Sequence, residues 1–463
     1  MKILVARKPG TYPLLTQLIC CSLLGLPLTA TSQSKPTASA QTKTAPAKTG
    51  TTSAQISNPP IALAYIDLAT NASDMPSGMA SAQSGGFLGA LGGMARGDSA
   101  GNNRGNVFGN THSMGFASGR FMDVSVFTSK NTALTDASQM LPPGMNLGDS
   151  LKLIAPLPDK PVTYTPTEES PSDPSYEKPK GKISIYWGCG ETVRPGQPRT
   201  LDAAKATPED YAKFFVMRGK LTKGARSQPG NPAWPNKADD RKVPDNASLV
   251  GQHQFVGNGI PESFKLNLGP GHDLMAAIDL VQTRKDGGVS LEWKTIPNAR
   301  GYFISVMGGQ SGKGDSSEVI VWTSSELPDF GFGLVDYQAN ADVDRWLNEK
   351  VILPANTSKC DVPKGIFGEQ GAGMLRMIAY GSDAYFAYPP RPVDSKVAWE
   401  PDWQTKLRMK STYSSILGGM GDMAGMGGRR NNNTSQVEPQ QRPEQKEEPK
   451  VKATDVLKGL LGF

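Results

Sequence analysis

The side chains that most often perform catalysis or bind metals are few and widely spaced in this chain. Its three histidines are His112, His253 and His272. No two of them have the spacing of a zinc-binding pair, and neither Cys189 nor Cys360 lies near one in the sequence. Acid–base or nucleophilic catalysis requires several convergent titratable groups. The sequence therefore predicts no catalytic residue, no cofactor and no conventional metal site, with each histidine on the surface or in the core.

The short motifs for nucleophiles and phosphates are incomplete. Gly309–Lys313 begins like a nucleophile elbow but ends in lysine instead of glycine, and Gly314 stands where a phosphate-binding loop needs serine or threonine. Three carboxylates remain available for an acid–base pair in a periplasmic enzyme, although no spacing selects two of them. They are Glu191, Asp202 and Glu369.

Methionines and tryptophans offer two further chemistries. Met420, Met423 and Met426 repeat every three residues among glycines, and thioethers are soft ligands suited to Cu(I). The alternative is a low-complexity segment that packs loosely or mediates association. Three tryptophans in Pro-rich or polar surroundings predict a platform of rings that stacks on sugars, or else rings that cover the edge of a β-sandwich. They are Trp234, Trp399 and Trp403.

The first 30 residues have the three-part plan of a secretory signal peptide. A basic start is followed by an uncharged apolar stretch, Leu14–Leu28, and Ala30 lies at the end. This stretch is shorter than the roughly 20 residues of a membrane span. The alternatives are an uncleaved anchor and a lipid anchor at Cys20 or Cys21. We expect an exported protein with no membrane span after cleavage. It would be periplasmic or associated with the outer envelope, and the alternative is secretion.

Export determines how the two remaining cysteines are interpreted. An oxidising compartment permits a disulfide between Cys189 and Cys360, and the alternative is two free buried thiols. The formal charge of the whole chain is only +6. That value is too small to indicate a nucleic-acid partner, which requires a strongly basic domain or stripe.

Composition and periodicity divide the chain into segments. Residues 31–58 hold few large apolar side chains, which predicts a disordered linker. A β-rich domain is expected over residues 59–281. It would contain a Gly/Met-rich loop at about 74–119, a Pro-rich loop at about 156–180, and one short helix capped by Thr207.

The strongest strand pattern follows this domain. Asp286-Gly287 predicts a hairpin turn, after which Val289–Trp293 alternates in the manner of a half-buried strand. A second alternating run contains Tyr302. This pattern resembles a fibronectin type III or immunoglobulin-like module over about residues 283–390. The resemblance implies a β-sandwich in which Trp293 and Tyr302 pack between two sheets. The rest of the chain resembles no family that we can name.

We therefore predict a mainly β protein with two β-sandwich-like domains, the second at residues 282–392. A peripheral segment is expected at 393–417, and a disordered Gly/Met-rich and then polar tail at 418–452. Residues 453–463 have apolar side chains at helical spacing, which predicts a C-terminal docking peptide. The alternatives are a tail that folds back on the core and one that contacts a membrane surface. The apolar positions are Val456, Leu457, Leu460, Leu461 and Phe463.

These observations favour an exported, non-catalytic cell-envelope protein. It would bind or scaffold partners, most simply another envelope protein, through β-sandwich surfaces and the docking peptide. Two alternatives stay open at this point. One is a carbohydrate-binding or carbohydrate-acting accessory protein with a polysaccharide partner, and the other is the periplasmic enzyme with a carboxylate pair.

Overall fold

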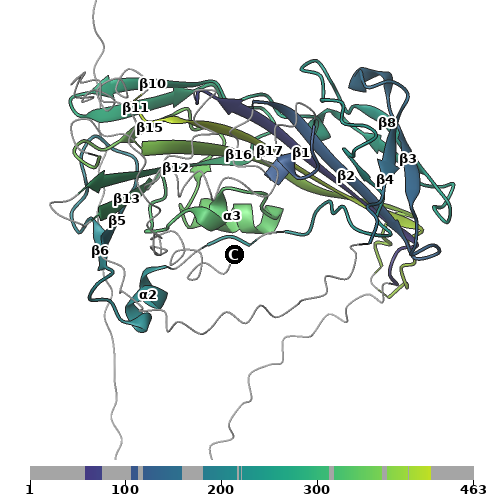
Figure 1. The fold of residues 1–463 in the computed structure, drawn as a ribbon, viewed down its shortest axis with the longest axis horizontal. Coiled ribbons are helices and arrows are strands. Elements are labelled where there is room, and N and C mark those ends of the chain that lie inside the picture. Colours follow the sequence, from purple (N-terminus) through teal and green to yellow (C-terminus); the bar gives the residue numbers. More distant parts are fainter. Residues whose placement is uncertain are drawn as a thin grey trace, which may run out of the picture. The chain divides into compact units, whose positions relative to one another are not determined.

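A computed structural model describes most of the chain between Asn58 and Gly418 (Figure 1). The predicted signal peptide and nearly all of the predicted linker lie outside the described residues. So do most of the Gly/Met-rich loop, most of the Pro-rich loop, the three methionines of the tail and the docking peptide. The described ranges are 58–75, 106–112, 118–158, 181–215, 218–220, 222–311, 317–367, 373–394 and 396–418.

The fold is mainly β, as predicted. Within the described ranges a main sheet of 14 strands runs in the order β6-β5-β13-β12-β16-β17-β1-β2-β7-β4-β3-β8-β9, and β14 pairs with β12 beside this path. Its strands are β1 (Ala62–Ser73), β2 (Gly119–Thr128), β3 (Asp136–Met140), β4 (Ser150–Ile154), β5 (Gly181–Trp187), β6 (Arg199–Asp202), β7 (Ala233–Trp234), β8 (Gly251–Val256), β9 (Lys265–Leu268), β12 (Gly301–Ser311), β13 (Ser317–Thr323), β14 (Leu353–Pro354), β16 (Gly373–Tyr388) and β17 (Trp403–Ile416).

A second sheet has three strands in the order β10-β11-β15. The hairpin between its first two strands turns at Asp286 and Gly287, which both have positive φ, as the Asp-Gly pair predicts. The strands are β10 (Leu280–Lys285), β11 (Gly288–Trp293) and β15 (Lys359–Val362).

Helical structure is sparse in the described ranges. The predicted helix is α2 (Pro208–Phe214), which begins with a capping box in which the Thr207 hydroxyl accepts from the Asp210 N–H and the Asp210 carboxylate accepts from the Thr207 N–H. The second helix is α3 (Asn340–Asn348). Neither is long and apolar enough to cross a bilayer. The 3₁₀ turns are η1 (Asn110–His112), η2 (Pro143–Met145), η3 (Pro270–His272) and η4 (Phe332–Leu334).

The main sheet crosses the predicted domain boundary at residue 282. β1 lies between β17 and β2, and it pairs in parallel with β17 over its whole length, from Ala62 opposite Trp403 to Ser73 opposite Ser414. The segment 393–417, which we predicted to be peripheral, therefore contributes a central strand. Lys406, Arg408 and Lys410 of this strand are buried, and each is paired with a carboxylate on another element.

The two sheets pack face to face at one end of the main sheet. Trp293 of β11 and Tyr302 of β12 belong to different sheets, and their ring centroids lie 5.5 Å apart in an edge-on arrangement. Both rings are buried, and the Tyr302 hydroxyl accepts from the Ile296 N–H at 2.8 Å. The two aromatic residues thus pack between sheets, while the family resemblance that suggested this stays a prediction.

The opposite face of the main sheet is covered near the same place by α3 (Figure 1). Val343 and Trp346 of α3 form a buried cluster with Phe303 of β12 and with Ile378 and Tyr380 of β16. Because side chains alternate along a strand, Phe303 points away from the face that Tyr302 occupies. The main sheet is therefore buried on both sides where β12 and β16 pair.

A disulfide joins the second sheet to the loop after β5. Cys189 follows β5 and Cys360 lies on β15, and the two are 171 residues apart in the sequence. Backbone hydrogen bonds flank the bridge, from Gly190 to Asp361 at 2.9 Å and from Lys364 to Glu191 at 3.1 Å. The disulfide thus closes a long loop between two sheets that also pack through Trp293 and Tyr302.

Removing this bridge with the double substitution Cys189→Ser and Cys360→Ser should lower the free energy of unfolding. The chain-entropy model gives an upper value of about 5 kcal/mol for a loop of this length. Urea unfolding of the oxidised and substituted proteins measures the difference. Equal transition midpoints would show that the bridge contributes nothing to stability.

Candidate functional site

A row of charged side chains crosses one face of the central strands. Asp67 of β1 lies opposite Arg408 of β17 and also opposite Asp123 of β2. Residues opposite one another in neighbouring strands point to the same face. Lys410 lies two residues after Arg408 on β17 and therefore points to this same face. We call these residues, together with His112 of η1 and Asp336 after η4, the ionic cluster.

Asp67 and Arg408 form the centre of the cluster. The guanidinium donates to both carboxylate oxygens, with Nε–Oδ1 at 2.7 Å and Nη2–Oδ2 at 2.5 Å, and the side chains are only 0% and 2% exposed. Burial by itself would raise the pKa of Asp67, but the hydrogen bonds from His112 and Arg408 outweigh it, so the pKa lies below its ordinary value. Both groups therefore stay charged in a nearly dry site.

Residues 222–225 cover the ion pair and bond directly to Asp67 and Arg408. Arg408 Nη1 donates to the Thr222 carbonyl at 2.7 Å and to its hydroxyl at 2.8 Å, while the Ala225 N–H donates to Asp67 at 2.9 Å. A Cβ atom added at Gly224 would lie 1.6 Å from Arg408 Nη2. Residues 222–225 thus lie directly on the ion pair, and only glycine fits at position 224.

His112 and Lys410 share the carboxylate of Asp336. His112 Nδ1 lies 2.9 Å from Asp336 Oδ2, and Lys410 Nζ lies 2.7 Å from Oδ1. Burial disfavours a charged His112, but hydrogen bonds to Asp336 and Asp67 outweigh that effect and raise its pKa to about 9. His112 is therefore a cation at neutral pH and holds η1 against the sheet.

Asp123 and Tyr337 complete the surroundings of the cluster. Asp123 accepts from the Gly109 N–H and from Thr111, yet burial, with the charge of Asp67 adding to it, raises its pKa to about 6. The Tyr337 ring centroid lies 4.3 Å from the Arg408 guanidinium and 4.5 Å from Lys410 Nζ. The charges thus neutralise one another beneath η1 and η4, and no group of three or more potential metal ligands occurs among the described residues.

A different kind of site lies where β16 and β17 meet the edge strand β9. A pocket of about 580 Å³ opens there, and we call it the aromatic pocket. Its lining comes from β9, from the end of β16 with the segment that follows, and from the start of β17. The lining residues are Lys265, Leu266, Asn267, Tyr385, Phe386, Ala387, Pro390, Arg391, Trp399, Trp403 and Gln404.

A β-bulge in β16 determines which rings reach this pocket. The register with β17 shifts between Tyr380 and Asp383, so that Phe386 and Tyr388 come to lie on the same face as Trp403. Gly381 lies in the bulge, where a Cβ atom would approach Met409 Cβ to 2.7 Å. Without the extra residue, Phe386 and Tyr388 would point to the opposite face of the sheet.

The indole N–H groups of Trp399 and Trp403 both donate to backbone carbonyls within the protein. Trp403 Nε1 donates to the Ser263 carbonyl at 2.7 Å, and its ring stacks on Phe264 at a centroid distance of 4.7 Å. Trp399 Nε1 donates to the Pro389 carbonyl at 3.0 Å, and the Arg391 guanidinium lies 5.3 Å from the Trp399 ring centroid. The rings are therefore held in place without a ligand.

Exposed aromatic surface is concentrated at this end of β16. Tyr385 is 69% exposed and Tyr388 is 49% exposed, and the Tyr388 ring lies nearly parallel to Trp403 at 6.4 Å. His272 of η3 packs edge-on against Phe386 at 5.1 Å. The pocket thus combines ring faces with the amides of Asn267 and Gln404 and two basic side chains.

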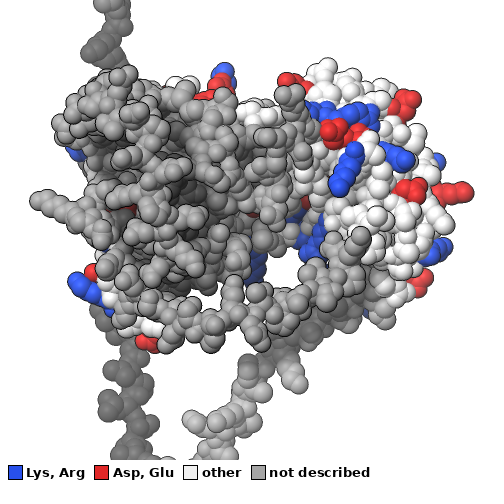
Figure 2. All heavy atoms as spheres, viewed as in Figure 1, with Lys and Arg blue, Asp and Glu red and all other residues white. Residues whose placement is uncertain are grey.

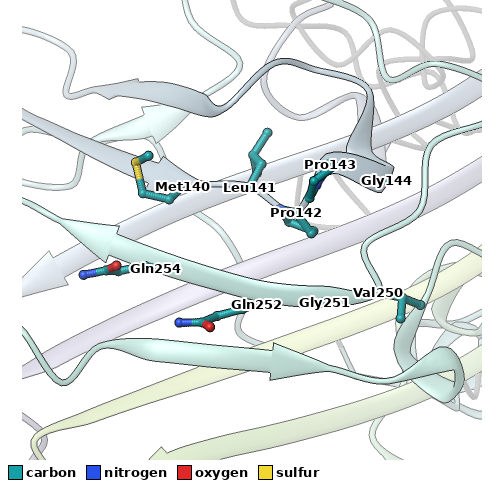
Figure 3. Close-up of a pocket in the computed structure, with 9 residues that line it drawn as sticks. All are labelled: Met140, Leu141, Pro142, Pro143, Gly144, Val250, Gly251, Gln252 and Gln254. Carbon is teal, nitrogen blue, oxygen red and sulfur yellow. The ribbon is translucent and has the colours of Figure 1, made fainter.

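A second pocket, of about 420 Å³, lies where η2 and β8 diverge (Figure 3). β3 pairs with β8 over Ser138–Met140, and beyond this ladder the Ser248 N–H donates to the Gly144 carbonyl at 2.8 Å. Gln252 and Gln254 contribute the polar surface on one side, opposite Pro142 and Pro143. Around β3, β4 and β8, Figure 2 shows acidic and basic side chains intermixed, which is typical of an ordinary solvated surface.

The predicted site residues fall into separate groups. Trp399 and Trp403 come together, but Trp234 is fully buried on β7 and lines neither pocket. His253 is buried and bonds to Gln139 and to the Leu249 carbonyl.

The other candidates are not brought together either. Glu191 and Asp202 line neither pocket. Glu369, Met420, Met423, Met426 and the docking peptide lie outside the described residues.

The ionic cluster was missed in the sequence analysis. Lys406, Arg408 and Lys410 alternate on β17 in the pattern of a solvated strand face, and their acidic partners lie far away in the sequence. The only available signal was that these charges interrupt an otherwise strand-like run.

No protein-family model matches the chain, and the comparison with curated proteins finds no significant match. The functional argument therefore depends on the geometry of the two sites.

Substitution of Arg408 by Met should leave the Asp67 carboxylate buried without its main partner. We expect a loss of about 3–5 kcal/mol in the free energy of unfolding, which is typical of breaking a buried ion pair. The double variant Asp67→Asn with Arg408→Met should be more stable than Arg408→Met alone, because no uncompensated charge remains. Urea unfolding of the three proteins tests this, and a double variant less stable than the single one would contradict it.

The stabilising contribution of His112 should depend on pH. Because folding raises the pKa of His112 from about 6.5 to about 9, the contribution is complete below pH 6.5 and is lost as the pH rises through 9. The difference in unfolding free energy between the wild type and His112→Gln should therefore shrink from pH 6.5 to 9.5. Comparing the two proteins largely cancels the titration of groups that both contain, such as Lys410. A constant difference across this range would refute the charged pair with Asp336.

Proposed function

We propose that this protein is an exported, non-catalytic cell-envelope protein that binds a partner at the aromatic pocket. The observation that carries the proposal is the clustering of Phe386, Trp399 and Trp403 around one concave site, with Tyr388 half-exposed beside them. When a ligand covers ring faces that are exposed to water in a pocket, removing this apolar surface from water favours binding. The indole N–H groups of Trp399 and Trp403 already have internal partners, and Trp403 is only 4% exposed. The half-buried rings of Phe386 and Trp399 are therefore the aromatic surface of the lining that is left for binding.

Placement of the titratable groups supports a non-catalytic role. Several groups with large pKa shifts, among them His112, Asp336 and Asp123, belong to the ionic cluster. There they pair with one another beneath η1 and η4 and do not face a pocket. Of the described residues that line the two pockets, none is His, Asp, Glu, Cys or Ser. The described lining therefore offers a bound substrate no carboxylate or imidazole for acid–base catalysis.

Export is supported by two independent features. The disulfide between Cys189 and Cys360 belongs to the type of bond that persists in oxidising compartments and is rare in the cytosol. The first 30 residues have the plan of a secretory signal peptide. Together these features favour the periplasm or the outer envelope as the place where the partner is met.

The C-terminal peptide at residues 453–463 is proposed as a second contact with an envelope partner. Its apolar side chains recur at helical spacing, as in peptides that dock into grooves of other proteins. The pocket and the peptide are far apart in the sequence, so their contributions to binding can be separated by mutation.

Affinity capture from an envelope extract tests the proposal. Trp399→Ala should reduce recovery of the partner severalfold, and deletion of residues 453–463 should reduce it independently. Trp187→Ala is the matched control, because Trp187 is a half-buried tryptophan on β5 and lines neither pocket. Equal recovery by the wild type and Trp399→Ala, with both proteins folded by circular dichroism, would exclude the aromatic pocket as the binding site.

A further inference from the structure

We infer that the outer edge of strand β10 pairs with the same edge of a second copy of this chain. An antiparallel pair of this kind would join the three-stranded sheets of both copies across a two-fold axis. β10 is the outermost strand of its sheet in the described part of the chain, and Figure 1 shows it at the upper margin of the fold. Its residues line neither pocket, so this contact is separate from the aromatic pocket.

The backbone groups of Gln282 point out of the sheet. The Trp293 N–H donates at 2.9 Å to the carbonyl of Ser358, just before β15, so Glu292 directs its own N–H and C=O toward β10. Glu292 lies opposite Val281, and the alternation along β10 therefore turns the N–H and C=O of Gln282 away from β11. Neither group has a hydrogen-bond partner within the described ranges. Such an edge accepts a further strand.

The side chains on the outer face of β10 suit a strand pair. Val281 is 57% exposed, and Thr283 and Lys285 are exposed as well. Branched side chains such as those of Val and Thr favour strands because they pack against cross-strand neighbours. The strand contains neither proline nor glycine, which would interrupt or weaken a ladder.

A two-fold axis restricts the register of the pair. Paired residues must both direct their backbone groups across the contact or both away from it, so one residue lies opposite itself. The outward positions of β10 are 280, 282 and 284. With Gln282 opposite itself, these three positions face one another. With Thr283 opposite itself, position 280 would face Asp286 of the turn, which has a φ of 44°. Centring on Gln282 therefore gives the longer ladder.

This register also brings opposite charges together. It places Asp279 of each copy opposite Lys285 of the other, and Val281 opposite Thr283. Asp279 bonds to Lys294 across the continued β10–β11 register at 3.0 Å, and its side chain is 64% exposed, so it can meet a second cation. Among the described residues, no carboxylate forms an ion pair with Lys285. A lysine on an edge normally discourages pairing, but here a carboxylate of the second copy would lie opposite it.

Sedimentation velocity of the full chain over a range of concentrations tests the inference. Two six-residue strands bury less surface than a standard interface of about 1,600 Å², so we expect a weak dimer with a Kd on the order of 10–100 μM. Asp279→Lys and Lys285→Asp should each weaken the dimer by roughly 3- to 10-fold, because each places like charges opposite one another at two symmetric positions.

Exchanging both charges is the decisive variant. The double variant Asp279→Lys with Lys285→Asp should return the Kd to within about twofold of the wild-type value, because opposite charges again face one another. Asp136→Lys on β3 and Lys152→Asp on β4 are matched controls and should dimerise like the wild type. All four residues are exposed, so the fold should survive each substitution, and circular dichroism checks that it does.

Three results would overturn the inference. A chain that stays monomeric at about 200 μM forms no such dimer. If deletion of residues 419–463 then produced a dimer, the chain's own tail would be the occupant of this edge, because it leaves beside β10, where the Gly418 N–H donates to Gln282 at 2.9 Å. A dimer that both single variants leave unchanged, or that the double variant fails to restore, would use another surface or another register.

Discussion

The ion pair between Asp67 and Arg408 is the interaction on which the centre of the sheet depends. Both side chains are almost completely removed from water, and such a pair is tolerated only when hydrogen bonds satisfy the remaining donors and acceptors. Thr222, Ala225 and His112 provide these bonds from segments far apart in the sequence. The pair therefore requires β1, β17 and their covering segments to be in place together, and this makes the middle of the sheet a cooperative unit.

The same two strands, β16 and β17, connect this unit to the aromatic pocket. The bulge at Gly381 is needed on both sides of the sheet. It places Asp383 opposite Arg408, where Lys406 pairs with it, and it places Phe386 and Tyr388 on the face of Trp403. An irregularity of one residue thus serves the buried charges and the proposed binding site at once. A rigid platform of rings needs such a support, because a site on flexible loops would lose entropy on binding.

Local features of this structure could be predicted from the sequence, and long-range pairing could not. The Asp-Gly hairpin, the capping box at Thr207 and the burial of Trp293 and Tyr302 all follow from residues close together in the chain. The ionic cluster joins Asp67 to Arg408, 341 residues apart, and periodicity carries no information on such a contact. The tryptophans of the pocket were noticed by type, but their convergence with Phe386 depends on the bulge in β16 and on β9 lining the same pocket as the start of β17.

The parallel pairing of β1 with β17 also explains why the pattern around Trp293 and Tyr302 can be recognised in the sequence although its strands belong to a larger sheet. The run from Val289 to Tyr302 has the alternation of two facing strands, and those strands do pack across two sheets. Yet β12 continues through β16 and β17 to β1, so the hydrogen bonds of the supposed module are completed by the strand that begins at Ala62. Cutting the chain near residue 282 would leave Arg408 without Asp67 and would remove the covering segment at His112, while Lys410 would keep Asp336. A fragment that begins there would carry a buried Arg408 without its carboxylate partner, and a buried charge that has lost its partner is strongly destabilising.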